Sequence, residues 1–397
     1  MQTGLTASQG RIKSIDLLRG LVMIIMALDH TRDFFHKDAF GNDPLDLSTT
    51  TPVLFFTRWI THFCAPVFVF LSGMSAWFQS IRKSKRELSR FLISRGIWLI
   101  LVEIFVVTLG ITGDIYYGFF ILQTIWAIGI SMVILGIAIW LPFPMLLLTG
   151  LIIVLGHNVL DVVEKDHKGP FPWWWYFLHI QTVLPLWGNR MLGIFYPFLP
   201  WTGLMMVGYC SGRLFTAYAL QQRNKILLRL GVGILIFFVA LRFTNLYGDP
   251  DPWSVQKNSL YTMLSFVNVR KYPPSLLYMS LTIGAAFIFL AFIKGAAGGV
   301  SKIIIVFGRV PFFYYIIHFY LLHLIAIILF LARGHSVAEG VAGAPGLPFK
   351  FVKPGEGFDL TGVYIVWILV VIALYPLCKW YDNYKTNHRE KWWLSYL

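Results

Sequence analysis

Ionisable residues recur within stretches of the chain that are otherwise apolar, and each of them is a candidate for chemistry. The first such stretch runs from Ser14 to Asp33. Arg19 and His30 lie eleven residues apart in it, so on a helix they share one face, about 16 Å apart along the axis. Asp33 falls within about 40° of the same line. A cation, an imidazole and a carboxylate therefore form one polar stripe.

Three interpretations of this stripe stay open. In the first, Arg19 is a snorkelling anchor and His30 is a packed core residue. In the second, His30 is one ligand of a haem between helices. In the third, His30 is a general base or a transient acyl carrier held by Asp33. The arginine favours the third, because a guanidinium suits a phosphate or carboxylate arriving from the cytoplasm.

Later apolar stretches repeat the pattern. Arg58 and His62 are four residues apart and share a helix face. Glu103 lies near the middle of another apolar stretch, where a buried carboxylate needs a partner, and we expect an arginine or a histidine.

The stretch from Gly308 to His323 contains both a predicted break and a candidate proton carrier. Pro311 predicts a break or kink beside Arg309, which leaves unpaired backbone N–H groups and a cation, a usable phosphate site. His318 lies on the face of Tyr314, and we expect it to assist His30 across the bundle. His323 is about 140° away from His318, so the two do not form a ligand pair on one helix.

Motifs of soluble nucleotide-binding, hydrolytic and metal enzymes are missing from the sequence. It contains no Gly-x-x-x-x-Gly-Lys-Ser/Thr loop, no Gly-x-Ser-x-Gly elbow, no Cys-x-x-Cys and no His-Glu-x-x-His. Cys64, Cys210 and Cys378 are too few and too scattered for a zinc cluster or a disulfide framework. We therefore expect neither a metal nor a haem.

The composition indicates which elements position these residues. Of the 397 residues, 57% are hydrophobic, only 13% are charged and 17% are aromatic. The mean hydropathy is +0.67. These values exclude an ordinary soluble enzyme and a disordered chain. They predict an all-α, polytopic membrane helical bundle that forms a single domain over residues 1–397, without an internal repeat.

About 20 mainly apolar residues are needed to cross a bilayer as a helix. Ten such runs are predicted: 15–35, 54–78, 91–112, 119–141, 143–160, 195–217, 226–246, 274–293, 303–332 and 361–381. The aromatic stretch Trp173–Trp187 is either an interfacial belt, a sugar-stacking platform or an eleventh, re-entrant piece.

The charges predict an orientation for the bundle. The net charge is +14, and the basic run from Arg82 to Arg95 lies between two predicted spans. An excess of Lys and Arg marks cytoplasmic loops, so both termini are predicted to be cytoplasmic, in a plasma (inner) membrane. The same rule accounts for the basic charge without nucleic acid. The longer segments 36–53, 161–194, 246–273 and 333–360 fall on the outer side, where they can form a vestibule.

Three blocks of sequence resemble a known family. Arg19-x10-His30 in the context Ser-Ile-Asp-Leu-Leu-Arg-Gly, Ala-Pro-Val-Phe-Val-Phe-Leu-Ser-Gly at 65–73, and Gly-Arg-Val-Pro…Tyr-Tyr-Ile-Ile-His at 308–318 occur in this order. The chain resembles the catalytic-domain family of heparan-alpha-glucosaminide N-acetyltransferase. More distantly, it resembles the acyltransferase 3 family, which shares the Arg-x10-His signature.

The resemblance implies a ten- or eleven-helix enzyme that uses acetyl-CoA from the cytoplasm and transfers the acetyl group to an amine or hydroxyl of a sugar or glycan across the membrane. Arg19 and His30 match the acyltransferase 3 signature. In the lysosomal branch, the acetyl-carrying histidine lies beyond the first span, and its nearest counterpart here is His36. That branch also has a large lumenal domain, so heparan itself is not expected as the acceptor.

The sequence thus predicts an acyltransferase, with a transporter or flippase for a small anionic or sugar solute as the alternative and a haem electron carrier as a third hypothesis. The predicted catalytic residues are His30, Asp33, His318 and His62, and the predicted donor-binding residues are Arg19, Arg309, Arg82, Lys83 and Arg86. The acceptor, the acyl chain length and the formation of a homodimer are not determined by the sequence.

Overall fold

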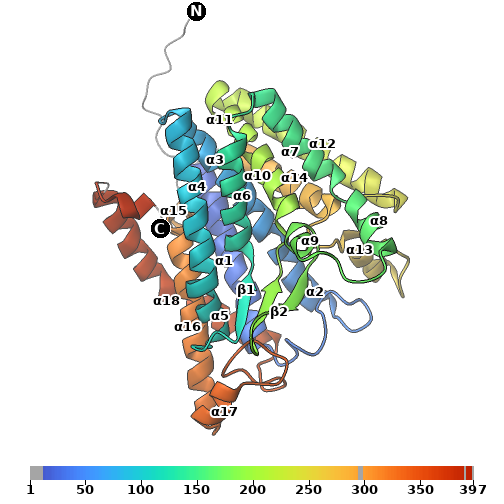
Figure 1. Cartoon of the computed structure of the whole chain (residues 1–397), viewed down its shortest axis with the longest axis vertical. Coiled ribbons are helices and arrows are strands. Elements are labelled where there is room, and N and C mark those ends of the chain that lie inside the picture. Colours follow the sequence, from blue (N-terminus) through green and yellow to red (C-terminus); the bar gives the residue numbers. More distant parts are fainter. Residues whose placement is uncertain (1–11, 294–297, 389, 396–397) are drawn as a thin grey trace, which may run out of the picture.

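The computed structural model describes residues 12–293, 298–388 and 390–395, which form a mostly helical bundle (Figure 1). The helices are α1 (Lys13–Phe35), α2 (Pro52–Trp59), α3 (Cys64–Ser80), α4 (Lys85–Val102), α5 (Thr108–Thr112), α6 (Thr124–Ala138), α7 (Phe143–Gly156), α8 (Val159–Asp166), α9 (Trp173–Leu178), α10 (Phe198–Ser211), α11 (Arg213–Ala217), α12 (Leu220–Thr244), α13 (Ser259–Val267), α14 (Leu276–Phe292), α15 (Gly299–Arg309), α16 (Pro311–Ala332), α17 (Val337–Ala342) and α18 (Leu360–Asn387). A 3₁₀ turn at Ile60–Phe63 joins α2 to α3, a π-helical turn at Glu103–Val107 joins α4 to α5, and a further 3₁₀ turn covers Trp392–Ser395.

Each of the ten predicted runs contains one of these helices. Five helical segments among the described residues are long and apolar enough to cross a membrane, or six if the bent pair α7 and α8 forms one span. The other runs fall short for physical reasons. The helices α6, α10 and α14 have only 15, 14 and 17 residues, and α1 carries charged residues along its length. The prediction of ten spans is therefore not confirmed.

A small sheet corrects the expectation of a purely helical chain. Strands β1 (Phe119–Leu122), β2 (Thr182–Pro185) and β3 (Met191–Ile194) associate in the order β1-β3-β2. β1 runs parallel to β3, which pairs antiparallel with β2. The predicted run 119–141 thus begins as a strand. The aromatic stretch after Pro172 forms only the six-residue helix α9, too short to span a membrane, before it enters β2.

The predicted break in the run 303–332 is confirmed. Helix α15 ends at Arg309 and α16 begins at Pro311, while Val310 between them has φ −128° and ψ 47°, outside the helical region. Proline has no N–H to donate and its ring collides with the preceding turn, so a new helix starts there.

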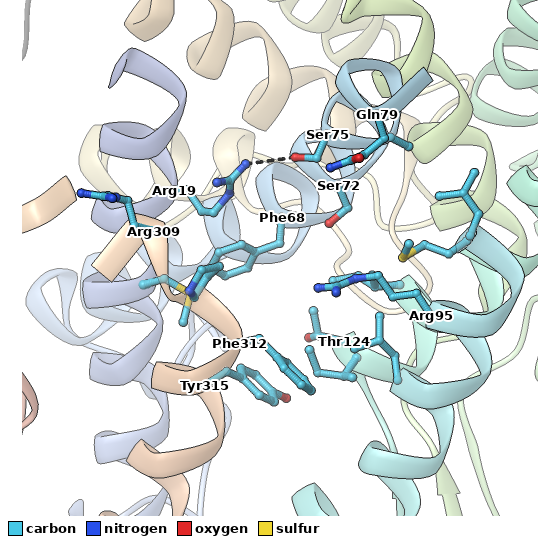
Figure 2. Close-up of a pocket in the computed structure, with 18 of the residues that line it drawn as sticks. Arg19, Phe68, Ser72, Ser75, Gln79, Arg95, Thr124, Arg309, Phe312 and Tyr315 are labelled. Carbon is cyan, nitrogen blue, oxygen red and sulfur yellow. Dashed lines mark hydrogen bonds between the residues drawn. The ribbon is translucent and has the colours of Figure 1, made fainter. Parts of the chain in front are cut away.

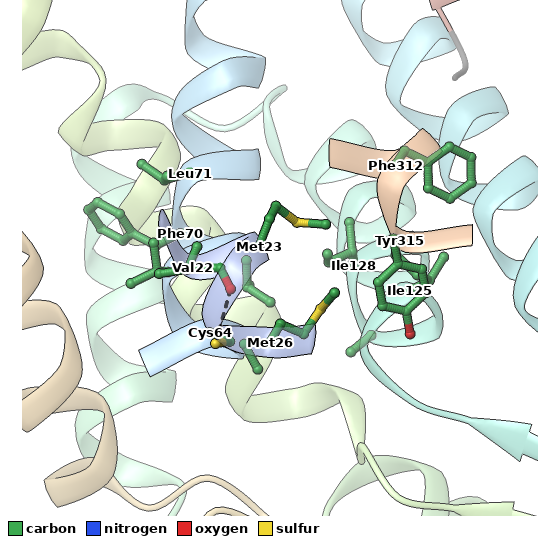
Figure 3. Packing of buried hydrophobic residues seen from close by; sticks show 14 of the residues in the cluster. Val22, Met23, Met26, Cys64, Phe70, Leu71, Ile125, Ile128, Phe312 and Tyr315 are labelled. Atoms are coloured by element: carbon green, nitrogen blue, oxygen red, sulfur yellow. Dashed lines mark hydrogen bonds between the residues drawn. The ribbon is translucent and has the colours of Figure 1, made fainter. Parts of the chain in front are cut away.

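Helix α1 runs through the middle of the bundle (Figure 1) and contacts α3, α14, α15, α16 and α18. Its methionines fill the space between helices: Figure 3 shows Met23 and Met26 pointing toward Ile125 and Ile128 of α6. On another side of α1, the thiol of Cys64 donates to the carbonyl of Val22 at 3.3 Å. Because α1 is enclosed by neighbours, its polar residues face protein rather than lipid.

A close approach of backbones brings α1 and α15 together. A Cβ on Gly20 would collide with the carbonyl oxygen of Ile304, and a Cβ on Gly308 would collide with that of Asp16. Only glycine permits this spacing, as in other tightly packed membrane helices. Since Arg19 and Arg309 are the direct neighbours of these glycines, the contact brings the two arginines to the same region.

Candidate functional site

A cavity of about 340 Å³ lies near the N-terminal end of α1 (Figure 2). Its lining includes four cationic side chains, Arg19, Arg95, Arg309 and Lys385. Neutral polar and apolar residues complete it: Met23, Phe68, Ser72, Ser75, Ala76, Gln79, Phe91, Leu92, Leu99, Thr124, Ile125, Ile128, Met132, Pro311, Phe312 and Tyr315. We call this space the inner cavity. Figure 2 shows Arg19 and Arg309 at one end, Phe312 and Tyr315 at the other, and Arg95 beside Thr124.

Arg19 is fixed in the inner cavity by three hydrogen bonds. Its guanidinium donates to the Asp16 carboxylate at 3.1 Å, to the Gly308 carbonyl at 3.2 Å and to the Ser75 hydroxyl at 3.1 Å. A guanidinium held by three elements is oriented before a ligand arrives, which lowers the entropy lost on binding.

Arg309 occupies the neighbouring position in the inner cavity. It forms an ion pair with Asp382 at 3.0 Å and donates to the Thr386 hydroxyl at 3.1 Å, both on α18. Its side chain remains 31% exposed, so this end of the cavity reaches solvent.

The sequence missed Lys385, because nothing in its local pattern relates the end of α18 to α1. The predicted residues Arg82, Lys83 and Arg86 lie at the start of α4 and its preceding turn, outside the lining of the cavity.

A second cavity, of about 80 Å³, lies near the C-terminal end of α1; we call it the outer cavity. It is lined by Asp29, His30, Asp33, Phe34, Arg58, Ile111, Gln123, Thr124, Tyr196, Lys271, Tyr272, Phe319 and Phe349. The Asp33 side chain is 35% exposed, so this cavity also reaches solvent. Arg19 and His30 therefore line different cavities at opposite ends of one helix.

His30 and His318 are brought together from α1 and α16, with 2.7 Å between Nδ1 of His30 and Nε2 of His318. The other nitrogen of His318, Nδ1, lies 3.2 Å from the Tyr314 carbonyl oxygen, which can only accept. In neutral His318, Nδ1 therefore carries the proton and Nε2 accepts from Nδ1–H of His30. Nε2 of His30 is left with a free lone pair, the form that a general base requires.

Sequence reasoning did not single out Asp29, although it directly precedes His30. Its side chain is 9% exposed and accepts a hydrogen bond from Arg58, while Arg32 and Lys271 lie 3.6 and 3.8 Å from its oxygens. Three cations thus surround one buried carboxylate. Helical periodicity could not reveal this cluster, because Lys271 comes from the loop between α13 and α14.

The other two predicted catalytic residues have different surroundings. Asp33 lines the outer cavity with His30, but its carboxylate accepts from Arg32 at 2.6 Å. His62 is buried and lies outside the linings of both cavities, and its backbone carbonyl accepts from the Tyr278 hydroxyl at 2.7 Å. Among the described residues, neither ring nitrogen of His62 has a hydrogen-bond partner.

His36, the counterpart suggested by the lysosomal branch, caps the C-terminus of α1. It lines a separate small cavity of about 30 Å³ with Phe34 and Glu356. Burial lowers the pKa of its imidazole. His36 therefore does not share the outer cavity with His30.

Glu103 finds a different partner from the predicted arginine or histidine. Its Oε1 accepts from the backbone N–H of Gln123 at 2.7 Å, just before α6 begins. A helix N-terminus offers unpaired N–H groups and a positive dipole end, which stabilise a carboxylate without a cation. Glu103 thereby holds the segment whose next residue, Thr124, lines both cavities.

The two cavities share a thin wall. Thr124 lines both cavities. Tyr315 lines the inner cavity and His30 lines the outer cavity, and the centroids of their rings are 6.5 Å apart. We call the part of the inner cavity beside Thr124 and Tyr315 its deep end. A group bound there is thus close to the imidazole of His30, which lines the outer cavity.

One cluster away from both cavities could hold a metal ion. Asp161, Glu164 and His179 place their ligand atoms within 4.8 Å of one another. Nδ1 of His179 lies 2.8 Å from Glu164 Oε1, and Nε2 lies 3.1 Å from Nδ1 of His157. None of these residues lines the inner or the outer cavity.

Comparison with known protein families identifies a match. The family model described as heparan-alpha-glucosaminide N-acetyltransferase, catalytic, matches residues 11–240. This range covers more than half of the chain and includes α1, α3, α4 and α6, which line the inner cavity. No curated protein matches the chain.

Proposed function

Because the chain belongs to the heparan-alpha-glucosaminide N-acetyltransferase catalytic family, we propose that it is a membrane-embedded acetyltransferase. It moves an acetyl group from cytoplasmic acetyl-CoA to an amine or hydroxyl of a sugar or glycan on the opposite side of the membrane. The observation that carries this proposal is the pair of cavities at the two ends of α1, separated by a wall that Thr124 and Tyr315 help to form.

The proposed topology has ten spans, both termini in the cytoplasm, and the inner cavity open to the cytoplasm. The basic run Arg82–Arg95 supports this orientation, because it begins in the turn before α4 and ends at Arg95 in the inner cavity. The acidic outer segments and the outer cavity then face the far side, which for an inner membrane is the periplasm or cell exterior.

The donor is bound through its phosphates. Arg19 and Arg309 take them at their end of the inner cavity, and Arg95 and Lys385 add positive charge to its lining, since guanidinium groups form bidentate, charge-assisted hydrogen bonds with phosphate. The pantetheine arm lies along the apolar lining, past Phe68 and Ile128, so that the thioester reaches the deep end.

The chemistry takes place between the two cavities. Nε2 of His30 removes the proton of the acceptor. The nitrogen or oxygen of the acceptor bonds to the thioester carbon, and the C–S bond breaks. The proton then passes from His30 to the sulfur, which leaves as the CoA thiol. A two-step alternative first forms an acetyl-imidazole on His30 and then acylates the acceptor. In either case, His318 holds the imidazole in the required tautomer.

The proposal is tested with purified protein in lipid nanodiscs, supplied with acetyl-CoA and a panel of amino sugars and glycans. We expect repeated turnover only when the acceptor is present, with free thiol and acetylated acceptor accumulating in equal amounts beyond one equivalent per protein. If the protein instead moves a sugar or anion across sealed vesicles without consuming acetyl-CoA, the chain is a transporter or flippase, the second candidate function.

The arginines of the inner cavity give a quantitative prediction. We expect Arg95→Ala to raise the KM for acetyl-CoA about 10- to 100-fold with a smaller change in kcat, because one charge-assisted hydrogen bond to phosphate contributes about 1.5–3 kcal/mol. Steady-state kinetics with varied acetyl-CoA measures it.

Arg229→Ala, at an exposed position on α12, is the control and should keep the wild-type KM. An unchanged KM in Arg95→Ala contradicts the phosphate site. A raised KM for acetyl-CoA in alanine variants of Arg82, Lys83 or Arg86 would show that the phosphate site extends beyond the cavity to these predicted residues.

A further inference from the structure

We propose that the hydroxyl of Tyr315 donates a hydrogen bond to the thioester carbonyl oxygen and stabilises the negative charge that develops there during acetyl transfer. This inference rests on the proposed function and assigns a residue to its chemical step. It concerns a tyrosine that lies within the motif at 308–318 but was assigned no role from the sequence.

Tyr315 is positioned where the thioester must arrive. It lies one turn into α16, directly after the break at Val310, and its side chain lines the inner cavity. Figure 2 places it at the deep end with Phe312 and Thr124, away from Arg19 and Arg309. Its ring meets that of His30 edge-on, with 6.5 Å between centroids and 80° between planes. A thioester carbonyl at this end of the cavity therefore lies next to both the imidazole of His30 and the hydroxyl of Tyr315.

The hydroxyl of Tyr315 is a buried donor without a protein partner among the described residues. The residue is only 4% exposed, and its oxygen has no hydrogen-bond partner within the described part of the chain. A buried hydroxyl without a partner costs about 1–3 kcal/mol. Such groups are rare, and an acceptor atom of a ligand bound at this end of the cavity would supply the missing partner.

Figure 2 places the other neutral donors Ser72, Ser75 and Gln79 on the side of the inner cavity away from Tyr315. The Ser75 hydroxyl donates to the Leu71 carbonyl and accepts from Arg19. Arg19 and Arg309 are held at the opposite end by Asp16 and Asp382. Tyr315 and Thr124 are thus the neutral donors at the deep end, and of these Tyr315 is the one whose ring meets that of His30.

The step balances without any further reactant. As the acceptor atom bonds to the carbonyl carbon, the C=O π electrons move to oxygen, and Tyr315 O–H donates to this oxyanion without giving up its proton. The carbonyl re-forms as the C–S bond breaks, and the acceptor's proton, held on His30, goes to the sulfur. A hydrogen bond that strengthens only in the transition state raises kcat rather than affinity.

The test compares Tyr315→Phe with Tyr381→Phe. Both tyrosines are 4% exposed and both hydroxyls are unpartnered among the described residues, but Tyr381 lies on α18 outside the linings of both cavities. Removing one oxyanion donor typically lowers kcat about 10²–10³-fold. We expect a loss of this size in Tyr315→Phe, with the Kd for CoA unchanged, and wild-type kcat in Tyr381→Phe.

Thermal stability of each variant in nanodiscs is measured alongside, because a structural role would lower it. A Tyr315→Phe enzyme with kcat within about threefold of the wild type overturns the inference, as does an equal loss in Tyr381→Phe. Failure of the wild-type protein itself to release thiol refutes the proposed function instead, so the two outcomes are distinct.

Discussion

His30→Ala protein is expected to bind CoA with normal affinity and to release no thiol above background. General-base catalysis by a positioned imidazole contributes about 10²–10⁴-fold to a rate. Here the loss is expected at or beyond the upper limit, since His30 is also the candidate acyl carrier. CoA affinity should persist, because the inner cavity with Arg19 and Arg309 does not include His30 in its lining.

The measurement pairs thiol release with calorimetric titration of CoA in nanodiscs. His335→Ala is the matched control. His335 pairs with Glu356 at 2.6 Å in an outer segment and lies outside the linings of both cavities. Full transfer activity in His30→Ala would refute the catalytic role of His30. Loss of both activity and CoA binding would indicate a structural role.

A related experiment separates the two chemical routes. Rapid quenching of wild-type protein with acetyl-CoA, followed by mass spectrometry of the peptide that contains His30, detects an acetyl-imidazole if the two-step route operates. Direct transfer leaves that peptide unmodified while thiol release depends on the acceptor.

The second large effect is expected from Asp29→Asn, which should prevent accumulation of folded protein. Asp29 is the buried counter-charge to Arg58, Arg32 and Lys271. Removing one partner of a buried ion pair costs about 3–5 kcal/mol, because the remaining charges stay buried without compensation. Typical folding free energies are only about 5–15 kcal/mol, so the loss is a large fraction of the total.

Size-exclusion profiles and thermal unfolding in detergent measure this effect. The double variant Asp29→Asn/Lys271→Met removes one of the three cations and should recover part of the lost stability. Asp251→Asn is the control: its carboxylate is 57% exposed and its ion pair is to Arg270, which is 39% exposed, so the expected loss is below about 1 kcal/mol. Wild-type stability in Asp29→Asn would contradict the charge argument.

The positions of the apolar helices could be predicted because hydrophobic runs and prolines act locally. All ten predicted runs contain helices, and the break at Pro311 follows from the missing N–H of proline. The small sheet was not predicted. Strand β1 pairs with β3, more than sixty residues away, and such pairing depends on which segments meet in space rather than on local propensity.

For the candidate site, the sequence by itself determined that Arg19 and His30 lie on one helix about 16 Å apart, because helical geometry fixes that spacing. Only the tertiary structure decided what each residue meets. It brings Lys271 to Asp29, Lys385 to the inner cavity, and His318 rather than Asp33 to the ring of His30. These partners come from distant segments, and their placement depends on how helices pack through close contacts such as Gly20 against α15, which no local pattern specifies.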